Sequence, residues 1–263
     1  MTESDDWLGA PVHAADNDTG NFPVLFSTMI IWRSLLLIYD SIDVQLRNRS
    51  GRRESFTHLL TDLEVRDGIR SFQQFPSLVE ELTFRRASVR YEIRPIERCL
   101  VTLTPMSDGM YWPSPGDTRE EIGRLVVPGS YQSIFVLWPS HNLKDRVSVP
   151  SAGWGLGMAA TAWSNSATYA TVGNAESWIW QMPVIGEVWL HEWLHGVCAY
   201  FAGQGYLMPE GDADGGARHG YTQSRISGWT DYYRDLMTGN VLEAGVLKGI
   251  PLDAWGARPP FLC

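Results

Sequence analysis

The chain has 263 residues, of which 44% are apolar, and its formal net charge is −9. That apolar content suffices for one sizeable core, or for a main domain with a smaller appendage. The negative charge argues against a nucleic-acid partner, because contact with the phosphate backbone requires a basic face. Three cysteines do not form a disulfide framework, and the acidic N-terminus lacks the regions of a secretory signal. We therefore expect a cytoplasmic protein.

The N-terminal third predicts an arm followed by a mainly helical portion. Residues 1–21 are polar and contain Asp, Asn and Gly, which is typical of a flexible arm. The most hydrophobic stretch, 22–40, has an arginine in its middle, so it predicts a buried helix or strand and no membrane partner. Two segments have apolar residues at helical spacing: 53–63 and 66–88, the second interrupted by Pro76. We therefore assign 22–88 to a mainly helical N-terminal portion.

The remaining chain, 89–263, is predicted to form one α+β domain, because its strand and helix patterns are intermixed. Alternating or continuously apolar runs predict strands, and periodic runs with capping residues predict helices. The strands are expected over 89–104, 131–139 and 166–173, and the helices over 117–126, from 186 to near Gly203, and over 228–240.

Residues 186–201 read GEVWLHEWLHGVCAYF and contain the pattern His-Glu-x-x-His. At about 100° per residue, His191, Glu192 and His195 occupy one sector of a helix. The opposite sector carries large apolar residues: Trp189, Leu190, Trp193, Leu194, Val197 and Phe201. This separation predicts a helix that is anchored in a core by one face and presents a polar triplet on the other.

The polar triplet predicts a metal centre with one Zn²⁺ per chain. Imidazoles one helical turn apart can bind the same Zn²⁺. Glu192 lies too far round the helix to be a good ligand, but it can accept a proton from a water molecule on the ion and return it to a leaving amine. Burying these three groups without partners would be costly, which argues against a chance match. We therefore expect His191 and His195 as zinc ligands and Glu192 as the catalytic base.

The third ligand is expected in the glycine-rich loop EGDADGGARHGY (210–221). His219 is the one histidine downstream of the pattern, and it would complete a three-histidine site with an open position. Acidic residues are the alternatives: Asp214 and Asp212 in the same loop, and Asp231 and Asp235 on the following helix. An acid that is not a ligand can instead orient a ligating imidazole. A Ca²⁺ site is disfavoured, because no ordered series of oxygen ligands follows the loop.

Tyr221, two residues beyond His219, is a candidate oxyanion donor, because a phenol near the metal can stabilise a tetrahedral intermediate. A packing role is the alternative for this tyrosine.

The segment HEWLH (191–195), with a strand before it and a strand–helix–strand order upstream, resembles the zincin metallopeptidases. The resemblance implies a twisted mixed sheet whose edge strand lies against the active-site helix, with zinc in the cleft. It identifies ATYATVG (167–173) as the edge strand that pairs with an extended peptide. The third-ligand patterns of the metzincin, gluzincin and aspzincin groups are not matched cleanly, and the N-terminal third lies outside the resemblance.

These patterns predict a zinc-dependent hydrolase that acts on a peptide or a small amide-containing substrate. One alternative is a zinc enzyme dedicated to a single small molecule or peptide in a biosynthetic pathway. Another is a non-catalytic zincin-like binding protein, which the intact Glu192 disfavours. Oligomeric state and cleavage specificity have no signal in the sequence.

Overall fold

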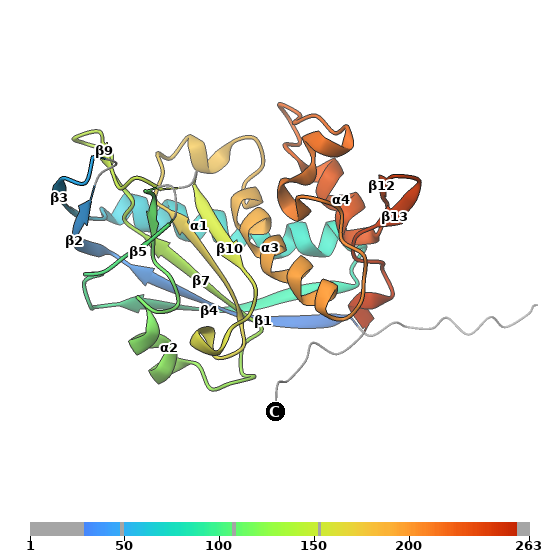
Figure 1. Ribbon diagram of the computed structural model, residues 1–263, viewed down its shortest axis with the longest axis horizontal. Coiled ribbons are helices and arrows are strands. Elements are labelled where there is room, and N and C mark those ends of the chain that lie inside the picture. The colour runs from blue at the N-terminus through green and yellow to red at the C-terminus, as the bar shows by residue number, and fades with distance from the viewer. Residues whose placement is uncertain (1–28, 48–49, 107–108, 152–153, 257–263) are drawn as a thin grey trace, which may run out of the picture.

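The computed structural model describes residues 29–47, 50–106, 109–151 and 154–256 (Figure 1). The arm expected over 1–21 lies outside these residues. No helix within the described ranges combines the length and apolar character needed to cross a bilayer.

A five-stranded mixed sheet lies at the centre, in the order β10-β11-β7-β1-β4 (Figure 1). Four strands run parallel, and β10 at one edge is antiparallel to β11. The strands are β1 (Ile30–Tyr39), β4 (Ala87–Ile96), β7 (Ser133–Trp138), β10 (Gly155–Met158) and β11 (Thr168–Gly173). The α+β class and the mixed sheet are therefore confirmed. The edge strand was expected at 167–173, but β11 there is buried at every residue, between β10 and β7.

The N-terminal portion contributes strands as well as a helix, which differs from the mainly helical portion expected over 22–88. The apolar run in 22–40 forms β1, which pairs with both β4 and β7. A strand covered on both faces has a continuous apolar sequence, which periodicity alone cannot distinguish from a buried helix. Next come β2 (Ser41–Arg47) and β3 (Arg53–Leu59), which form an antiparallel hairpin. The sheet therefore joins strands from both sides of the boundary expected at residue 89.

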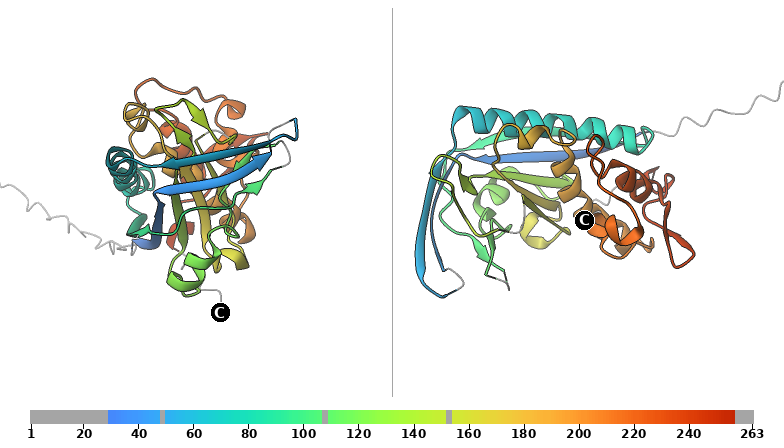
Figure 2. Two further views of the ribbon diagram at one scale, coloured as in Figure 1. Left: turned by 90° about the vertical axis from the view of Figure 1, so that its left-hand side faces the viewer. Right: turned by 90° about the horizontal axis from the view of Figure 1, so that it is seen from above.

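The long helix α1 (Asp62–Leu82) covers one face of the sheet and lies along β1 and β4 in Figure 2. A capping box starts it: the Thr61 hydroxyl accepts the Glu64 N–H, and the Glu64 carboxylate accepts the Thr61 N–H at 2.8 Å. Its inward face is aromatic, with Phe72 and Phe75 fully buried against the residues of α3. This layer of helices holds the candidate site.

Three further helices follow, α2 (Arg119–Leu125), α3 (Glu187–Gly203) and α4 (Thr230–Thr238), near the helices expected from the sequence. α4 begins at Thr230, two residues later than expected, with Trp229 as its N-cap, and it ends at Thr238, where Gly239 with φ 73° is the C-cap. The short strands are β5 (Thr104–Pro105), β6 (Tyr111–Trp112), β8 (His141–Asn142), β9 (Val147–Ser148), β12 (Val241–Glu243) and β13 (Val246–Lys248). The 3₁₀ turns are η1 (Ala162–Ser164), η2 (Ile179–Gln181), η3 (Asp212–Gly215), η4 (Ala217–His219) and η5 (Ala254–Gly256).

A partly buried ion pair, in which Glu121 is buried and Arg98 is 29% exposed, lies on the opposite face of the sheet, where α2 packs. The Arg98 guanidinium donates to both Glu121 carboxylate oxygens, at 2.7 and 2.8 Å, and the Tyr39 hydroxyl donates to Oε2 at 2.5 Å. Burial raises the pKa of the 1%-exposed Glu121, but the hydrogen bonds from Arg98 and Tyr39 lower it by more. The stability that this group contributes is therefore present above the ordinary carboxyl pKa and is lost as the pH falls through the lowered one.

Arg98→Met is accordingly expected to destabilise the fold at pH 7 by about 3 kcal/mol, because it leaves the Glu121 carboxylate buried without its cation. Denaturant unfolding should show a smaller difference at pH 4, where the variant protonates Glu121. The matched control is Arg94→Met, because the Arg94–Glu92 side chains are 56% and 50% exposed and such a pair contributes below about 1 kcal/mol. Equal losses for the two variants, or a loss that does not depend on pH, would contradict this account.

Candidate metal centre

Helix α3 is anchored through the face that the sequence predicted. All six large apolar residues of that face are at most 3% exposed, and Cys198 is buried among them. Gly186 starts the helix with φ 91°, and a Cβ there would lie 2.7 Å from the Phe75 backbone nitrogen. The N-terminus of α3 is therefore fixed directly against α1, and the opposite face of α3 is left for polar residues.

The edge strand β10 crosses α3 at Glu192, and glycines make this close approach possible. A Cβ on Gly155 would lie 2.6 Å from the Glu192 Cγ and Oε1 atoms. A Cβ on Gly157 would lie only 1.9 Å from the Glu192 carbonyl oxygen. Strand β10 therefore contacts the catalytic candidate directly and limits where its carboxylate can lie.

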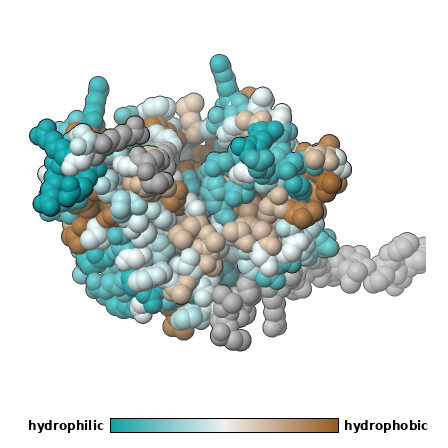
Figure 3. All heavy atoms as spheres, in the orientation of Figure 1, coloured by the Kyte–Doolittle hydropathy of each residue, from teal (hydrophilic) through white to brown (hydrophobic). Residues whose placement is uncertain are grey.

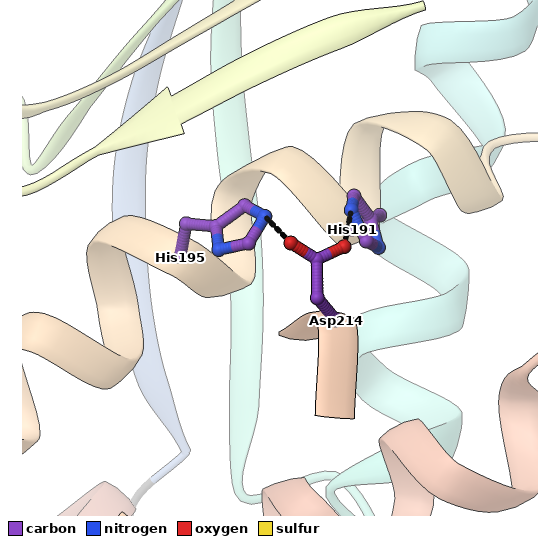
Figure 4. Close-up of side chains that lie close together, drawn as sticks. All are labelled: His191, His195 and Asp214. Atoms are coloured by element: carbon purple, nitrogen blue, oxygen red, sulfur yellow. Dashed lines mark ion pairs between the residues drawn. The ribbon is translucent and has the colours of Figure 1, made fainter. Parts of the chain in front are cut away.

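Three side chains converge beside this contact, His191 and His195 from α3 and Asp214 from η3 (Figure 4). We call them the donor triad. The Asp214 carboxylate oxygens lie 3.3 Å from His191 Nε2 and 3.8 Å from His195 Nε2. Two ligands about 2.1 Å from one tetrahedral Zn²⁺ are about 3.4 Å apart, so these spacings fit a shared ion.

The remaining ring nitrogens of the two histidines have partners of their own. His191 Nδ1 lies 2.8 Å from the Tyr233 hydroxyl, and His195 Nδ1 lies 2.6 Å from Asp212 Oδ1. Burial lowers the pKa of His195, but the carboxylates of Asp212, Glu192 and Asp214 together raise it by more. Both rings are thereby oriented so that Nε2 faces Asp214, which is how outer partners position histidines at metal sites.

Glu192 lies between His191 and His195 in the sequence and is 6% exposed. Burial raises the pKa of its carboxyl to about 7. Asp214 differs: its side chain is 72% exposed, and its hydrogen bond with His191 lowers the carboxyl pKa. The two carboxyl groups therefore suit different chemistry. Glu192 is suited to exchange a proton, and Asp214 is suited to bind a cation as an anion.

The structure places His219, the expected third ligand, outside the donor triad. Its Nε2 donates to the Glu210 carbonyl at 2.9 Å, and its ring stacks on Tyr232. The two residues lie on consecutive 3₁₀ turns that direct them to different places. Turn η3 directs Asp214 toward α3, whereas η4 directs His219 toward β12, where its Nε2 lies 3.6 Å from Glu243. The side chain that lies beside both histidines is the acidic alternative, Asp214.

The other residues expected near the metal have partners elsewhere. The Tyr221 hydroxyl donates to Asp235 Oδ2 at 2.5 Å, and Tyr221 is not among the residues that line the cleft. Asp231 pairs with Arg234 at 2.9 Å. Tyr233, which does reach His191, was missed because nothing in the sequence of α4 distinguishes it from Tyr232. Asp212, weighed as a ligand, instead occupies the orienting position.

A cleft of about 550 Å³ opens beside the donor triad. Its polar end is formed by the triad, Glu192 and Tyr233, and the rest is mostly apolar. On the face seen in Figure 3, a band of apolar residues separates two hydrophilic regions. The centre therefore combines metal donors, a proton-exchanging carboxyl and space for a substrate.

Asp212→Asn is expected to weaken zinc binding by about tenfold, the lower end of the effect of losing an outer-shell partner. Asn keeps the shape and tolerates the left-handed backbone at this position, φ 36°, but it removes the charge that holds His195. Chelator competition on the full chain measures the affinity. Asp231→Asn is the control, since Asp231 contacts Arg234 on the exposed face of α4, and unchanged affinity in Asp212→Asn would argue against the orienting role.

The resemblance of HEWLH to the zincins is limited to the sequence motif. Comparison with protein-family models, with curated proteins and with solved structures finds no match for this chain.

Proposed function

We propose that this chain is a zinc-dependent hydrolase of peptide or amide bonds. The observation that carries the proposal is the convergence of His191, His195 and Asp214 directly beside the buried Glu192, at one end of a cleft. Three protein donors leave one position of a tetrahedral ion open, which is the arrangement of catalytic zinc sites, whereas structural sites use four.

Each residue has a defined role in this proposal. The donor triad would hold Zn²⁺, with two neutral imidazoles and one carboxylate as the donors. When bound, the ion would act as a Lewis acid on the substrate carbonyl and would lower the pKa of a water molecule. Glu192 accepts the proton of the attacking water and passes it to the leaving nitrogen. Burial raises the pKa of the Glu192 carboxyl, which favours the uptake and return of a proton.

The proposal is tested on the full chain by metal analysis together with digestion of a mixed peptide library. We expect about one zinc per chain, cleavage products detected by mass spectrometry, and loss of cleavage on chelation that is restored by zinc. A chain that takes up no zinc at micromolar concentration would contradict the proposal. Zinc binding without cleavage of any peptide would favour the narrower alternative, an enzyme dedicated to one substrate.

A further inference from the structure

The cleft continues from the donor triad into an apolar wall, formed by Ala175, Ile179, Trp180, Val184 and Val188. Val188 lies one turn before His191 on α3, so the wall adjoins the metal end of the cleft. The other four come from the segment between β11 and α3, which includes η2. A substrate side chain next to the bond being cleaved would therefore meet apolar surface.

The acidic side chains that line the cleft have no basic counterpart among the described Lys and Arg residues. Among the described residues that line it, the charged side chains are Glu187, Glu192 and Asp214, and neither Lys nor Arg occurs. The Glu187 carboxylate is held by a hydrogen bond within the protein, because its Oε1 accepts the Trp229 N–H at 2.6 Å. A substrate carboxylate placed against the apolar wall would lose hydration without gaining a cationic side chain as a partner, which is unfavourable.

The open edge of β10 offers a guide for an extended peptide. The Trp154 carbonyl accepts the Gly173 N–H at 2.8 Å. In the antiparallel pattern the N–H and C=O groups of the alternate residues Gly155 and Gly157 therefore point away from β11. Within the described chain no strand pairs with that edge. Main-chain pairing along this edge and a pocket for a side chain are the two components of strand-addition recognition.

We propose that the cleft selects a bulky apolar side chain next to the scissile bond, lodged against the apolar wall, and rejects a free carboxylate in that place. This selectivity rests on the proposed hydrolase function and defines its substrate class. The occupant is an extended peptide segment that is neutral where it meets the wall.

The first test measures binding without turnover on the zinc-loaded full chain. Peptide hydroxamates, which carry their own metal-binding group, are compared by calorimetry with Phe, Gly or Asp in the position next to that group. Burial of the apolar side chain should make the Phe compound bind about 10- to 100-fold more tightly than the Gly compound. The Asp compound should bind more weakly than both. Equal affinities for the three would overturn the inference.

The second test measures cleavage of end-blocked peptides that differ only in the residue beside the scissile bond, varied on each side in separate sets. Cleavage with no preference for Phe over Asp would overturn the inference and leave the hydrolase proposal standing. The predicted order of hydroxamate affinities without any cleavage would contradict the hydrolase proposal and leave the preference of the cleft standing.

A positive charge introduced into the apolar wall should reverse the preference of the cleft. Val184→Arg should improve binding of the Asp compound by about tenfold and weaken binding of the Phe compound, because a cation now faces the side chain. Met182→Arg, at a residue that is 63% exposed and also lines the cleft, serves the same purpose if Val184→Arg does not fold. The control, Val127→Arg, lies outside the cleft at a residue that is 71% exposed. An unchanged Asp-to-Phe ratio in both cleft variants would overturn the inference.

Discussion

The Asp214→Ala variant is expected to lose tight zinc binding while keeping its fold. The Asp214 side chain is 72% exposed, so its removal leaves no cavity, yet it supplies the only donor of the triad that does not come from α3. Losing a direct ligand should cost more than the roughly 10- to 100-fold that loss of an outer partner costs. Metal analysis after dialysis against a weak chelator, with thermal unfolding of the same sample, measures both properties.

The matched control is His219→Gln, which removes the imidazole but keeps a donor for the Glu210 carbonyl. We expect this variant to retain zinc with unchanged affinity. The reverse result, zinc retained in Asp214→Ala and lost in His219→Gln, would show that the third donor is the histidine.

The second large effect is expected for Glu192→Gln, which should retain one zinc and lose hydrolysis by a factor of about 10² to 10⁴. Gln has the shape of Glu and fits against Gly155 and Gly157, but it cannot accept and return a proton. Steady-state cleavage of the best library peptide, normalised to bound zinc, measures the loss.

A Glu-to-Gln substitution far from the cleft shows whether the loss of hydrolysis comes from position 192 or from the removal of any one negative charge. Glu120 lies on α2 with its side chain 73% exposed, and Glu120→Gln should keep full activity. Full activity in Glu192→Gln would exclude this carboxyl as the base, and loss of zinc from that variant would indicate that Glu192 is a ligand.

The part of the site carried by α3 could be predicted from the sequence, because a helix imposes its own geometry. The positions of His191, Glu192 and His195 on one face follow from the 100° step, and the buried opposite face is confirmed. The helices near 119–125 and 230–238 were also predictable from local patterns, whereas the mixed sheet was expected only from the resemblance to zincins. Helices are features that residues close in sequence determine among themselves.

Features that depend on distant contacts could not be predicted in the same way. The choice of Asp214 over His219 follows from the direction of two short 3₁₀ turns, which composition does not specify. Tyr233 meets His191 only because α4 packs near α3, 42 residues along the chain. The central strand β1 was ambiguous for a similar reason, since its apolar run becomes a strand through pairing with β4 and β7.

The contact between β10 and α3 also determines which substitutions a relative of this chain can accept. Most apolar residues on the buried face of α3 can be exchanged for others of similar volume with modest cost. Gly155 and Gly157 cannot, because any side chain would occupy space already filled by Glu192. We therefore expect the recognisable signature to be discontinuous. It would consist of two glycines one residue apart, the His-Glu-x-x-His helix, and an aspartate 19 positions after the second histidine (214 − 195 = 19). Such a pattern would identify distant relatives even where the rest of the sequence has changed completely.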